Sequence, residues 1–234
     1  MEIYAVDVSN HLDRKYFQHL FECLGSQKQY RIQSFYHDDD KERALIGEIL
    51  IRYMISHYLN MRPDRIILKY STYGKPYIEE DSVFFNLSHS GKWVVAVIDH
   101  KENGIDVQEI GKVDMSVAKN FFLQREYLEL MQLEGKSRAN LFYELWTLKE
   151  SYIKTIGKGL SIPLNSFILE KLKGNQYQSF TGEKLIFFQT YNIDPQYKMA
   201  LGSYNSQLAQ NVTILTSHHL YKLFVNSLQN EQII

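Results

Sequence analysis

The sequence predicts an α+β fold with antiparallel sheets, on two observations. Hairpin-type turns join consecutive strand-like runs, and helices and strands are interspersed without the βαβ alternation that predicts a doubly wound parallel sheet. With 234 residues and 44% hydrophobic content, the chain can bury one substantial core or two modest ones. Length alone therefore does not separate a single domain from a tight pair of domains.

One strand and one long helix are expected before residue 60. Hydrophobic side chains alternate over residues 3–8 as in a half-buried strand. Residues 38–40 are three aspartates, which is typical of the first turn of a helix, and the pattern continues the helix to about residue 59. Gly47 lies inside this helix, where glycine is about 1 kcal/mol less favourable than alanine. Close packing, an approaching ligand and simple tolerance are three explanations of this glycine.

Three strands are expected next. Residues 83–87 and 93–98 are strand-like and are joined by a turn at residues 90–91, so they predict an antiparallel hairpin. Asn103-Gly104 is the strongest hairpin signal in the chain, and residues 105–110 follow it as a strand. The sequence therefore predicts a three-stranded meander in this region.

The second half is expected to begin with a loop at residues 111–116. Ser116 is the predicted N-cap of a helix that runs to about residue 133, and a second helix covers about residues 140–156. Later strand-like runs lie at residues 167–171, 185–190 and 198–202. The chain then becomes polar, and its last residues are expected to fray.

Composition excludes several classes of partner. The formal net charge is −1 and the Lys and Arg residues are dispersed, so neither a nucleic-acid backbone nor a membrane surface is an expected partner. No targeting segment opens the chain, and no run approaches the roughly 18 apolar residues of a spanning helix. Cys23 is the single cysteine, which excludes an internal disulfide and favours a reducing cytoplasm.

The segment at residues 146–160 carries the strongest functional signal. Trp146, Glu150 and Lys154 are spaced i, i+4 and i+8, so they lie along one face of a helix, with Lys149 turned by about 100°. In an arbitrary helix such a carboxylate and lysine are more often an exposed pair worth about 0.2–0.5 kcal/mol. Other groups in the chain favour a functional interpretation.

Asp106 provides the second signal. Because strand side chains alternate, Asp106 and Gln108 share one face and can touch one ligand together. With Glu150 they offer an all-oxygen set suited to Mg²⁺. Asp106 alone does not indicate a metal site, since a single Asp beside a turn usually bonds local backbone groups.

Cationic and donor groups accompany this set and can surround a multiply anionic ligand: Lys28, Arg31, Arg43, Lys75, His89 and Lys154. Each of them alone is more often a surface residue. Ser88 and His89 do not predict a serine hydrolase, because neighbouring strand side chains point to opposite faces and the chain has no G-x-S-x-G elbow.

Taken in order, these motifs resemble the 4′-phosphopantetheinyl transferases of the surfactin-synthetase-activating type. The resemblance spans about residues 1–201, and its most specific part is a Gly-Ile-Asp element followed at the right distance by a Trp-Lys-Glu-Lys-Gly signature. The matching motifs are Phe35-Tyr36-His37, Gly74-Lys75-Pro76, Phe85-Asn86-Leu87-Ser88-His89-Ser90-Gly91, Gly104-Ile105-Asp106 and Trp146-x-x-Lys149-Glu150-x-x-x-Lys154-x-x-Gly157-x-Gly159-Leu160.

The resemblance implies an enzyme that transfers 4′-phosphopantetheine from coenzyme A to a serine of an apo peptidyl or acyl carrier domain, releasing adenosine 3′,5′-bisphosphate. It implies two similar α+β halves related by a pseudo-twofold, which we expect at residues 1–102 and 103–234, with the active site in the cleft between them. A monomer is expected, because one chain holds both halves. Carrier docking is expected at residues 111–116 and on the helix that bears Phe121 and Phe122.

The resemblance also implies site residues. Mg²⁺, with Mn²⁺ as an alternative, is expected at Asp106, Gln108 and Glu150. Glu150 is expected to draw off the serine proton, directly or through a metal-bound water. Lys154 is expected beside the pyrophosphate as a second catalytic group. The residues expected around coenzyme A are Lys28, Arg31, Arg43, Lys75, Ser88, His89, Lys149 and Lys154.

Two departures from the family pattern affect these expectations. Gln108 stands where relatives commonly have Glu, and Glu109 points to the opposite face unless a bulge shifts the strand, so weaker Mg²⁺ binding is expected. Ala44 stands where some relatives have a hydroxyl that reaches the nucleotide phosphate. Two other functions stay open: a module that binds coenzyme A or carrier domains without turnover, and a metal-dependent pyrophosphate hydrolase that needs no carrier.

Overall fold

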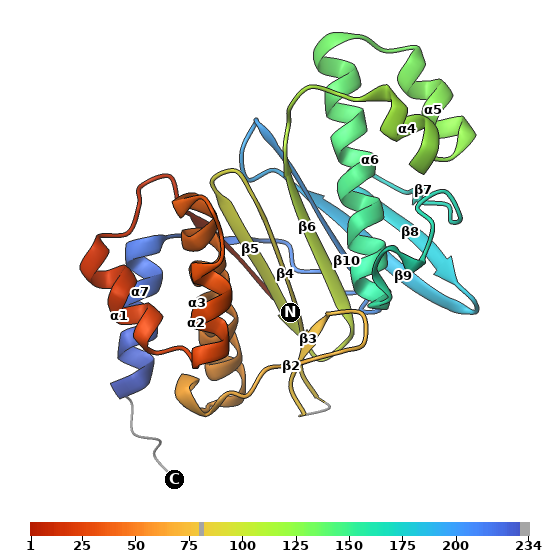
Figure 1. Ribbon diagram of the computed structural model, residues 1–234. Helices are drawn as coiled ribbons and strands as arrows, with labels where there is room; N and C mark the ends of the chain where they lie inside the picture. The colour runs from red at the N-terminus through yellow and green to blue at the C-terminus, as the bar shows by residue number, and fades with distance from the viewer. Residues whose placement is uncertain (80–81, 230–234) are drawn as a thin grey trace.

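Two β-sheets, each covered by one 22-residue helix, form the centre of the computed structural model, which describes residues 1–79 and 82–229 (Figure 1). The first sheet has the strand order β11-β1-β5-β4 and the second has the order β6-β10-β9-β8-β7. The strand pairs of the described residues are antiparallel except for β1 and β11, which are parallel. The prediction of an α+β fold with antiparallel sheets is confirmed.

The first unit is built around α3. The strand predicted at residues 3–8, the helix at residues 38–59 and the hairpin at residues 83–98 are all present. The elements of this unit are β1 (Glu2–Asp7), α1 (Arg14–Glu22), α2 (Ser26–Gln33), α3 (Asp38–Leu59), the short helix η1 (Pro63–Arg65), β2 (Lys69–Tyr70), β3 (Pro76–Tyr77), β4 (Phe84–Ser90), β5 (Trp93–Asp99), β11 (Thr213–Thr216) and α7 (Ser217–Gln229).

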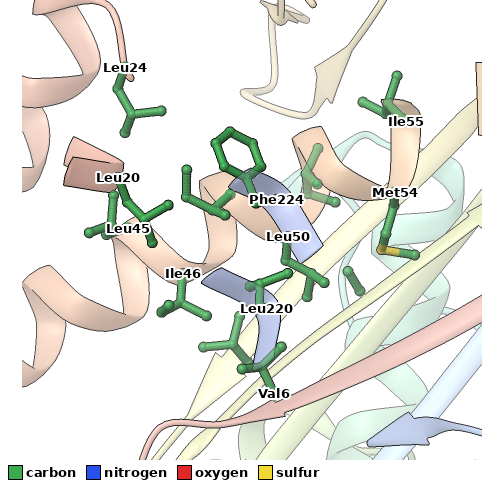
Figure 2. Close-up of a cluster of buried hydrophobic side chains, with 14 of the residues drawn as sticks. Val6, Leu20, Leu24, Leu45, Ile46, Leu50, Met54, Ile55, Leu220 and Phe224 are labelled. Carbon is green, nitrogen blue, oxygen red and sulfur yellow. The ribbon is translucent and has the colours of Figure 1, made fainter. Parts of the chain in front are cut away.

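Packing around α3 explains why this unit holds together. Side chains of α3 are buried on more than one face, since β4 and β5 contact the helix from the sheet, and α1, α2 and α7 contact it from elsewhere. Figure 2 shows Leu220 and Phe224 of α7 packed near Leu45 and Leu50 of α3. At Gly47, a Cβ would lie 2.8 Å from Cδ2 of Leu87 on β4, which supports close packing, and Gly47 also lines a pocket, which supports an approaching ligand.

The second unit is built around α6, which packs on β6 and β10. In Figure 1, α4 and α5 lie at the N-terminal end of α6, away from the first unit. The elements of this unit are β6 (Asn103–Glu109), α4 (Met115–Phe121), α5 (Gln124–Met131), α6 (Gly135–Ile156), the short helix η2 (Gly159–Ser161), β7 (Glu170–Lys171), β8 (Gln176–Thr181), β9 (Lys184–Tyr191) and β10 (Tyr197–Ser203).

The predicted three-stranded meander is wrong. β5 pairs with β1 and β4, whereas β6 pairs with β10, so the chain changes sheets between β5 and β6. Asn103 and Gly104 lie inside β6 instead of in a turn. Asn103 is fully buried, and its Nδ2 donates to the carbonyl oxygens of Phe84 at 2.9 Å and Lys101 at 3.1 Å. Asn103-Gly104 has the sequence of a hairpin turn, but its asparagine is buried and bonds a backbone carbonyl oxygen elsewhere in the fold.

The helix predicted from Ser116 to residue 133 is also wrong, because it is two helices. Extended backbone at Phe122 and Leu123 separates α4 from α5. The N-cap of α4 is Asp114, whose Oδ1 accepts a hydrogen bond from the Ser116 N–H at 2.9 Å.

Helices α1, α2 and α7 and strands β8 and β11 were not predicted. In α7, Leu220, Leu223 and Phe224 recur at helical spacing, but the Asn, Gln and Ser residues of this region indicated a polar end of the chain. The predicted fraying of the last residues falls on residues 230–234, outside the described range.

A pair of glycines lets α6 approach the second sheet closely. Gly104 on β6 and Gly202 on β10 are direct neighbours in the strand register. A Cβ at Gly104 would lie 2.3 Å from the backbone nitrogen of Thr155 and 2.4 Å from the carbonyl oxygen of Ser151. A Cβ at Gly202 would lie 2.8 Å from Oγ1 of Thr155. These two glycines therefore set the distance between α6 and the strand that carries Asp106.

The boundary between the halves at residue 102 stays a prediction. The chain passes from the first sheet to the second near this residue, between β5 and β6, but its C-terminal segment returns to the first unit: β11 pairs with β1, and α7 packs against α3. A search of residues 1–79 and 82–229 finds no helix with the length and apolarity needed to span a membrane.

We expect Gly104→Ala to destabilise the fold by about 3 kcal/mol, because the new methyl group meets helix backbone that cannot turn aside. Chemical denaturation measures this loss. Gly25→Ala is the matched control, since nothing lies within 4 Å of a Cβ at Gly25. A Gly104→Ala variant as stable as the Gly25→Ala variant would contradict the close contact of α6 with β6.

Candidate active site

Asp106 is the centre of a buried polar cluster between the two units. Asp106 is 2% exposed, and its Oδ1 accepts hydrogen bonds from the Ser88 hydroxyl at 2.8 Å and from Lys154 Nζ at 2.7 Å. Lys154 Nζ also donates to Ser88 Oγ at 3.0 Å and to the Ile105 carbonyl oxygen at 3.1 Å. Because the three side chains come from β6, β4 and α6, the cluster forms only when the two units pack together.

Glu150 lies one helical turn before Lys154 on α6. Within residues 1–79 and 82–229, no hydrogen bond or ion pair holds its carboxylate. Burial raises the pKa of Glu150, and the nearby charge of Asp106 raises it further, whereas Lys154 lowers it. Two carboxylates share one lysine here, so one negative charge is left for a cation to balance.

Gln108 is at the edge of this cluster, where its Nε2 donates to Asp106 Oδ2 at 3.1 Å. The register of β6 with β10 is unbroken, so no bulge turns Glu109 inward, and Glu109 instead faces Tyr197. In the part of the chain that the structure describes, no group of three or more His, Cys, Asp or Glu side chains is arranged to hold a metal. The available donors are two carboxylates and one amide oxygen, which fit Mg²⁺ with water or substrate oxygens as its remaining ligands.

A pocket of about 220 Å³ lies on the first unit beside this cluster. Asn86 and His89 of β4 line it on either side of Ser88, so the pocket and the cluster share one strand. Lys28 and Arg31 of α2 add positive charge to its wall. Its apolar lining comes from Ile32, Phe35, Ala44, Ile51, Leu68, Pro76, Phe85 and Leu87. An apolar pocket with cationic side chains suits a flat apolar group that carries phosphates.

Lys28 is held in place by residues that were not predicted from the sequence as part of the site. Its Nζ donates to Glu48 Oε2 at 2.7 Å and to the hydroxyl of Tyr70. Glu48 is buried and also accepts a hydrogen bond from Arg52 Nε at 3.1 Å. The i, i+4 spacing of Glu48 and Arg52 inside a largely apolar helix was the available signal for a buried ion pair.

Arg43 contributes positive charge beside the pocket, and His89 contributes an imidazole to the pocket wall. Arg43 donates to the Gly91 carbonyl oxygen at 2.9 Å and to Asp40 Oδ1 at 2.7 Å, and it lines a neighbouring hollow. Burial lowers the pKa of His89, and the charges of Arg43 and Lys154 lower it further. A bound anion would reverse that effect, because an opposite charge favours protonated histidine.

The structure places Lys75 and Lys149 away from this pocket's wall. Lys75 Nζ donates to three backbone carbonyl oxygens, those of Asn103 at 2.9 Å, Lys154 at 2.6 Å and Thr155 at 3.4 Å, and burial lowers its pKa to about 8. Lys149 is fully buried in a 3.0 Å ion pair with Glu126 and donates to the Leu164 carbonyl oxygen at 2.9 Å. These contacts fasten the C-terminal end of α6 and the pair of helices α4 and α5.

The structure separates the roles of the two phenylalanines that the sequence could not distinguish. Phe121 is 44% exposed, whereas Phe122 is buried against Phe142 and Trp146. Beside these helices, the loop at residues 110–113 lines a hollow of about 570 Å³ together with residues 135–136, 138–140 and 195–196. An exposed aromatic side chain and a hollow at the same end of the second unit are suited to a protein partner.

Comparisons with known proteins give a consistent result over nearly the whole chain. Residues 12–101 match a family model described as 4′-phosphopantetheinyl transferase, N-terminal, and residues 102–204 match the model of the 4′-phosphopantetheinyl transferase superfamily. The chain is 34% identical to the 4′-phosphopantetheinyl transferase gsp of Aneurinibacillus migulanus, across 99% of this chain and 98% of that protein. It is 32% identical to the 4′-phosphopantetheinyl transferase Sfp of Bacillus subtilis (strain 168), across 94% and 100%.

In metal-free buffer at neutral pH, we expect Glu150→Gln to raise the melting temperature. The folded protein disfavours the charged carboxylate, so the pKa of Glu150 is higher in the folded state than in the unfolded state. The wild type therefore loses stability as the pH rises through the folded-state pKa, and regains it as the pH falls to the unfolded-state pKa. The advantage of the variant should therefore shrink on acidification to about pH 4, which thermal unfolding across this range measures. Glu183→Gln, at an exposed carboxylate, is the control; equal behaviour of both variants would contradict the interpretation.

Proposed function

The chain belongs to the 4′-phosphopantetheinyl transferase superfamily, and from this premise we propose that it transfers 4′-phosphopantetheine from coenzyme A to a serine of an apo carrier protein, releasing adenosine 3′,5′-bisphosphate. The observation that carries the proposal is the meeting of two features along β4. A basic pocket able to hold the nucleotide lies directly beside a cluster of two carboxylates and a lysine. Binding and reacting groups are thus contiguous, as phosphoryl transfer requires.

Lys28, Arg31 and His89 supply the binding of the nucleotide phosphates. Their donors converge on the pocket from α2 and β4, and Glu48 holds Lys28 in a fixed position before the ligand arrives. Arg43, which precedes the pocket residue Ala44 on α3 and lines the neighbouring hollow, adds to the positive potential. Preorganised cations of this kind bind phosphates without a large loss of side-chain entropy.

Glu150 and Lys154 carry the chemical step. Glu150 accepts the proton of the attacking serine, directly or through a water, because its carboxylate has no hydrogen-bond partner among the described residues and its pKa is raised. Lys154 Nζ donates to Asp106, Ser88 and the Ile105 carbonyl oxygen, so it steadies the departing phosphate through its positive charge and not through a free N–H group.

Asp106, Glu150 and the amide oxygen of Gln108 are the residues that would hold Mg²⁺, or Mn²⁺ in its place. When bound, the ion neutralises charge on the pyrophosphate. We further propose that the protein works as a monomer in the cytoplasm, and that a peptidyl or acyl carrier domain docks at residues 111–116 beside Phe121, where a hollow and an exposed ring lie close to α6.

The two alternative functions have less support. A binding module without turnover is not favoured, because Glu150 and Lys154 are both present and the relatives that match along the whole chain are transferases. A pyrophosphate hydrolase would release adenosine bisphosphate from coenzyme A without any carrier. A carrier-free assay separates this activity from transfer.

To test the transfer, the purified protein is incubated with coenzyme A, Mg²⁺ and an apo peptidyl carrier domain, and the intact mass of the carrier is measured. We expect one phosphopantetheinyl group on the carrier serine, and a rate lowered about 10²-fold or more in Glu150→Ala. An unchanged carrier mass with the peptidyl carrier and with a fatty-acid carrier, under both Mg²⁺ and Mn²⁺, would reject the proposal.

We expect Gln108→Glu to lower the Mg²⁺ concentration for half-maximal rate, because it adds a third carboxylate on the face of β6 that carries Asp106. Glu109→Gln is the control, since Glu109 lies on the opposite face and should leave the titration unchanged. Identical metal titrations for the wild type and Gln108→Glu would show that position 108 does not contribute to metal binding.

A further inference from the structure

β6 has two different neighbours. On one side it pairs with β10, and on the other it runs beside β4, although the two strands belong to different sheets (Figure 1). In an antiparallel pair only alternate residues direct their N–H groups to the partner strand. The N–H groups of Ile105, Val107 and Glu109 instead reach β4.

Side chains of β4 accept these three N–H groups in place of a backbone ladder. Asn86 Oδ1 accepts from Ile105 at 3.0 Å, Ser88 Oγ accepts from Val107 at 3.4 Å, and Ser90 Oγ accepts from Glu109 at 3.0 Å. The three acceptors are every second residue of β4, so they lie on one face of the strand. Each acceptor precedes its donor by the same number of residues, so β4 and β6 run in the same direction. Asn86, Ser88 and Ser90 are called the seam residues below.

Ser88, the central seam residue, connects the register of β4 and β6 to the reacting groups. Ser88 has one hydroxyl hydrogen, which it donates to Asp106, and its oxygen accepts from both Val107 and Lys154. Its hydrogen-bonding capacity is thus used within the protein. Ser88 reaches Asp106 only when β6 lies in this register, because a shift by one residue would turn Asp106 to the other face.

We propose that the seam residues are positioning residues: by accepting the N–H groups of β6 they hold β6 in register with β4 and so place Asp106 against Lys154. This inference rests on the proposed transferase function for its catalytic consequence. It assigns Ser88 to the support of Asp106, and it adds Asn86 and Ser90, which touch neither Asp106 nor Lys154 by any hydrogen bond among the described residues.

Ser90 gives the cleanest test, because it does not line the nucleotide pocket as Asn86 does. We expect Ser90→Ala to lower kcat about tenfold, since a displacement below 1 Å at a reacting group is costly, while KM for coenzyme A changes little. Ser90→Thr keeps the hydroxyl acceptor and should restore kcat. Ser179→Ala is the matched control: Ser179 is a buried serine of β8 whose hydroxyl donates to the Ile168 carbonyl oxygen, and its loss should lower the melting temperature without lowering kcat.

Amide hydrogen exchange, followed residue by residue by NMR, tests the seam without any turnover. The Glu109 amide should be protected in the wild type and in Ser90→Thr, and should exchange faster in Ser90→Ala, with Val107 affected less. Unchanged exchange at Glu109, unchanged kcat in Ser90→Ala, or an equal loss of kcat in Ser179→Ala would each overturn the inference. If the wild type itself transfers nothing, the proposed function fails, and exchange still decides whether the seam orders β6.

Discussion

The contact between the backbone of α6 and the glycine pair on β6 and β10 is the constraint on which the active site depends. Gly104 lies so close to Ser151 and Thr155 that any side chain there would collide with helix backbone. Lys154 precedes Thr155, and Asp106 follows Gly104 by two residues on the strand. The 2.7 Å ion pair of Lys154 and Asp106 is therefore set by how closely the helix lies on the sheet.

The cluster carries more negative than positive charge. Asp106 and Glu150 share the charge of Lys154, and burial raises the cost of the second carboxylate. A structure selected only for stability would replace Glu150 with a neutral side chain. The excess negative charge is the electrostatic basis of the proposed cation site, and the cationic pocket beside it is the basis of the proposed phosphate binding, so regions of opposite charge lie next to each other along β4.

The relative placement of several site residues could be predicted from local sequence patterns. Alternation along a strand correctly placed Asp106 and Gln108 on one face with Glu109 opposite, and helical spacing correctly placed Glu150 and Lys154 together. The meander was wrong because Asn103-Gly104 has the sequence of a tight turn, yet its asparagine is buried and its glycine is needed for the approach of α6. A local signal cannot distinguish a glycine required by a turn from one required by a distant helix.

The sequence by itself determined the fold class and the family, because periodicity and motif spacing are properties of the chain, and from the same patterns it predicted the chemical type of the site. Only the tertiary structure decided which lysines reach the pocket: Lys28 does so, whereas Lys75 is saturated by backbone carbonyl oxygens and Lys149 by Glu126. It also decided that side chains of β4, rather than a backbone ladder, join the two sheets. These outcomes depend on partners far away in the sequence, and a lysine carries no local sign of which carboxylate or carbonyl oxygen it will meet.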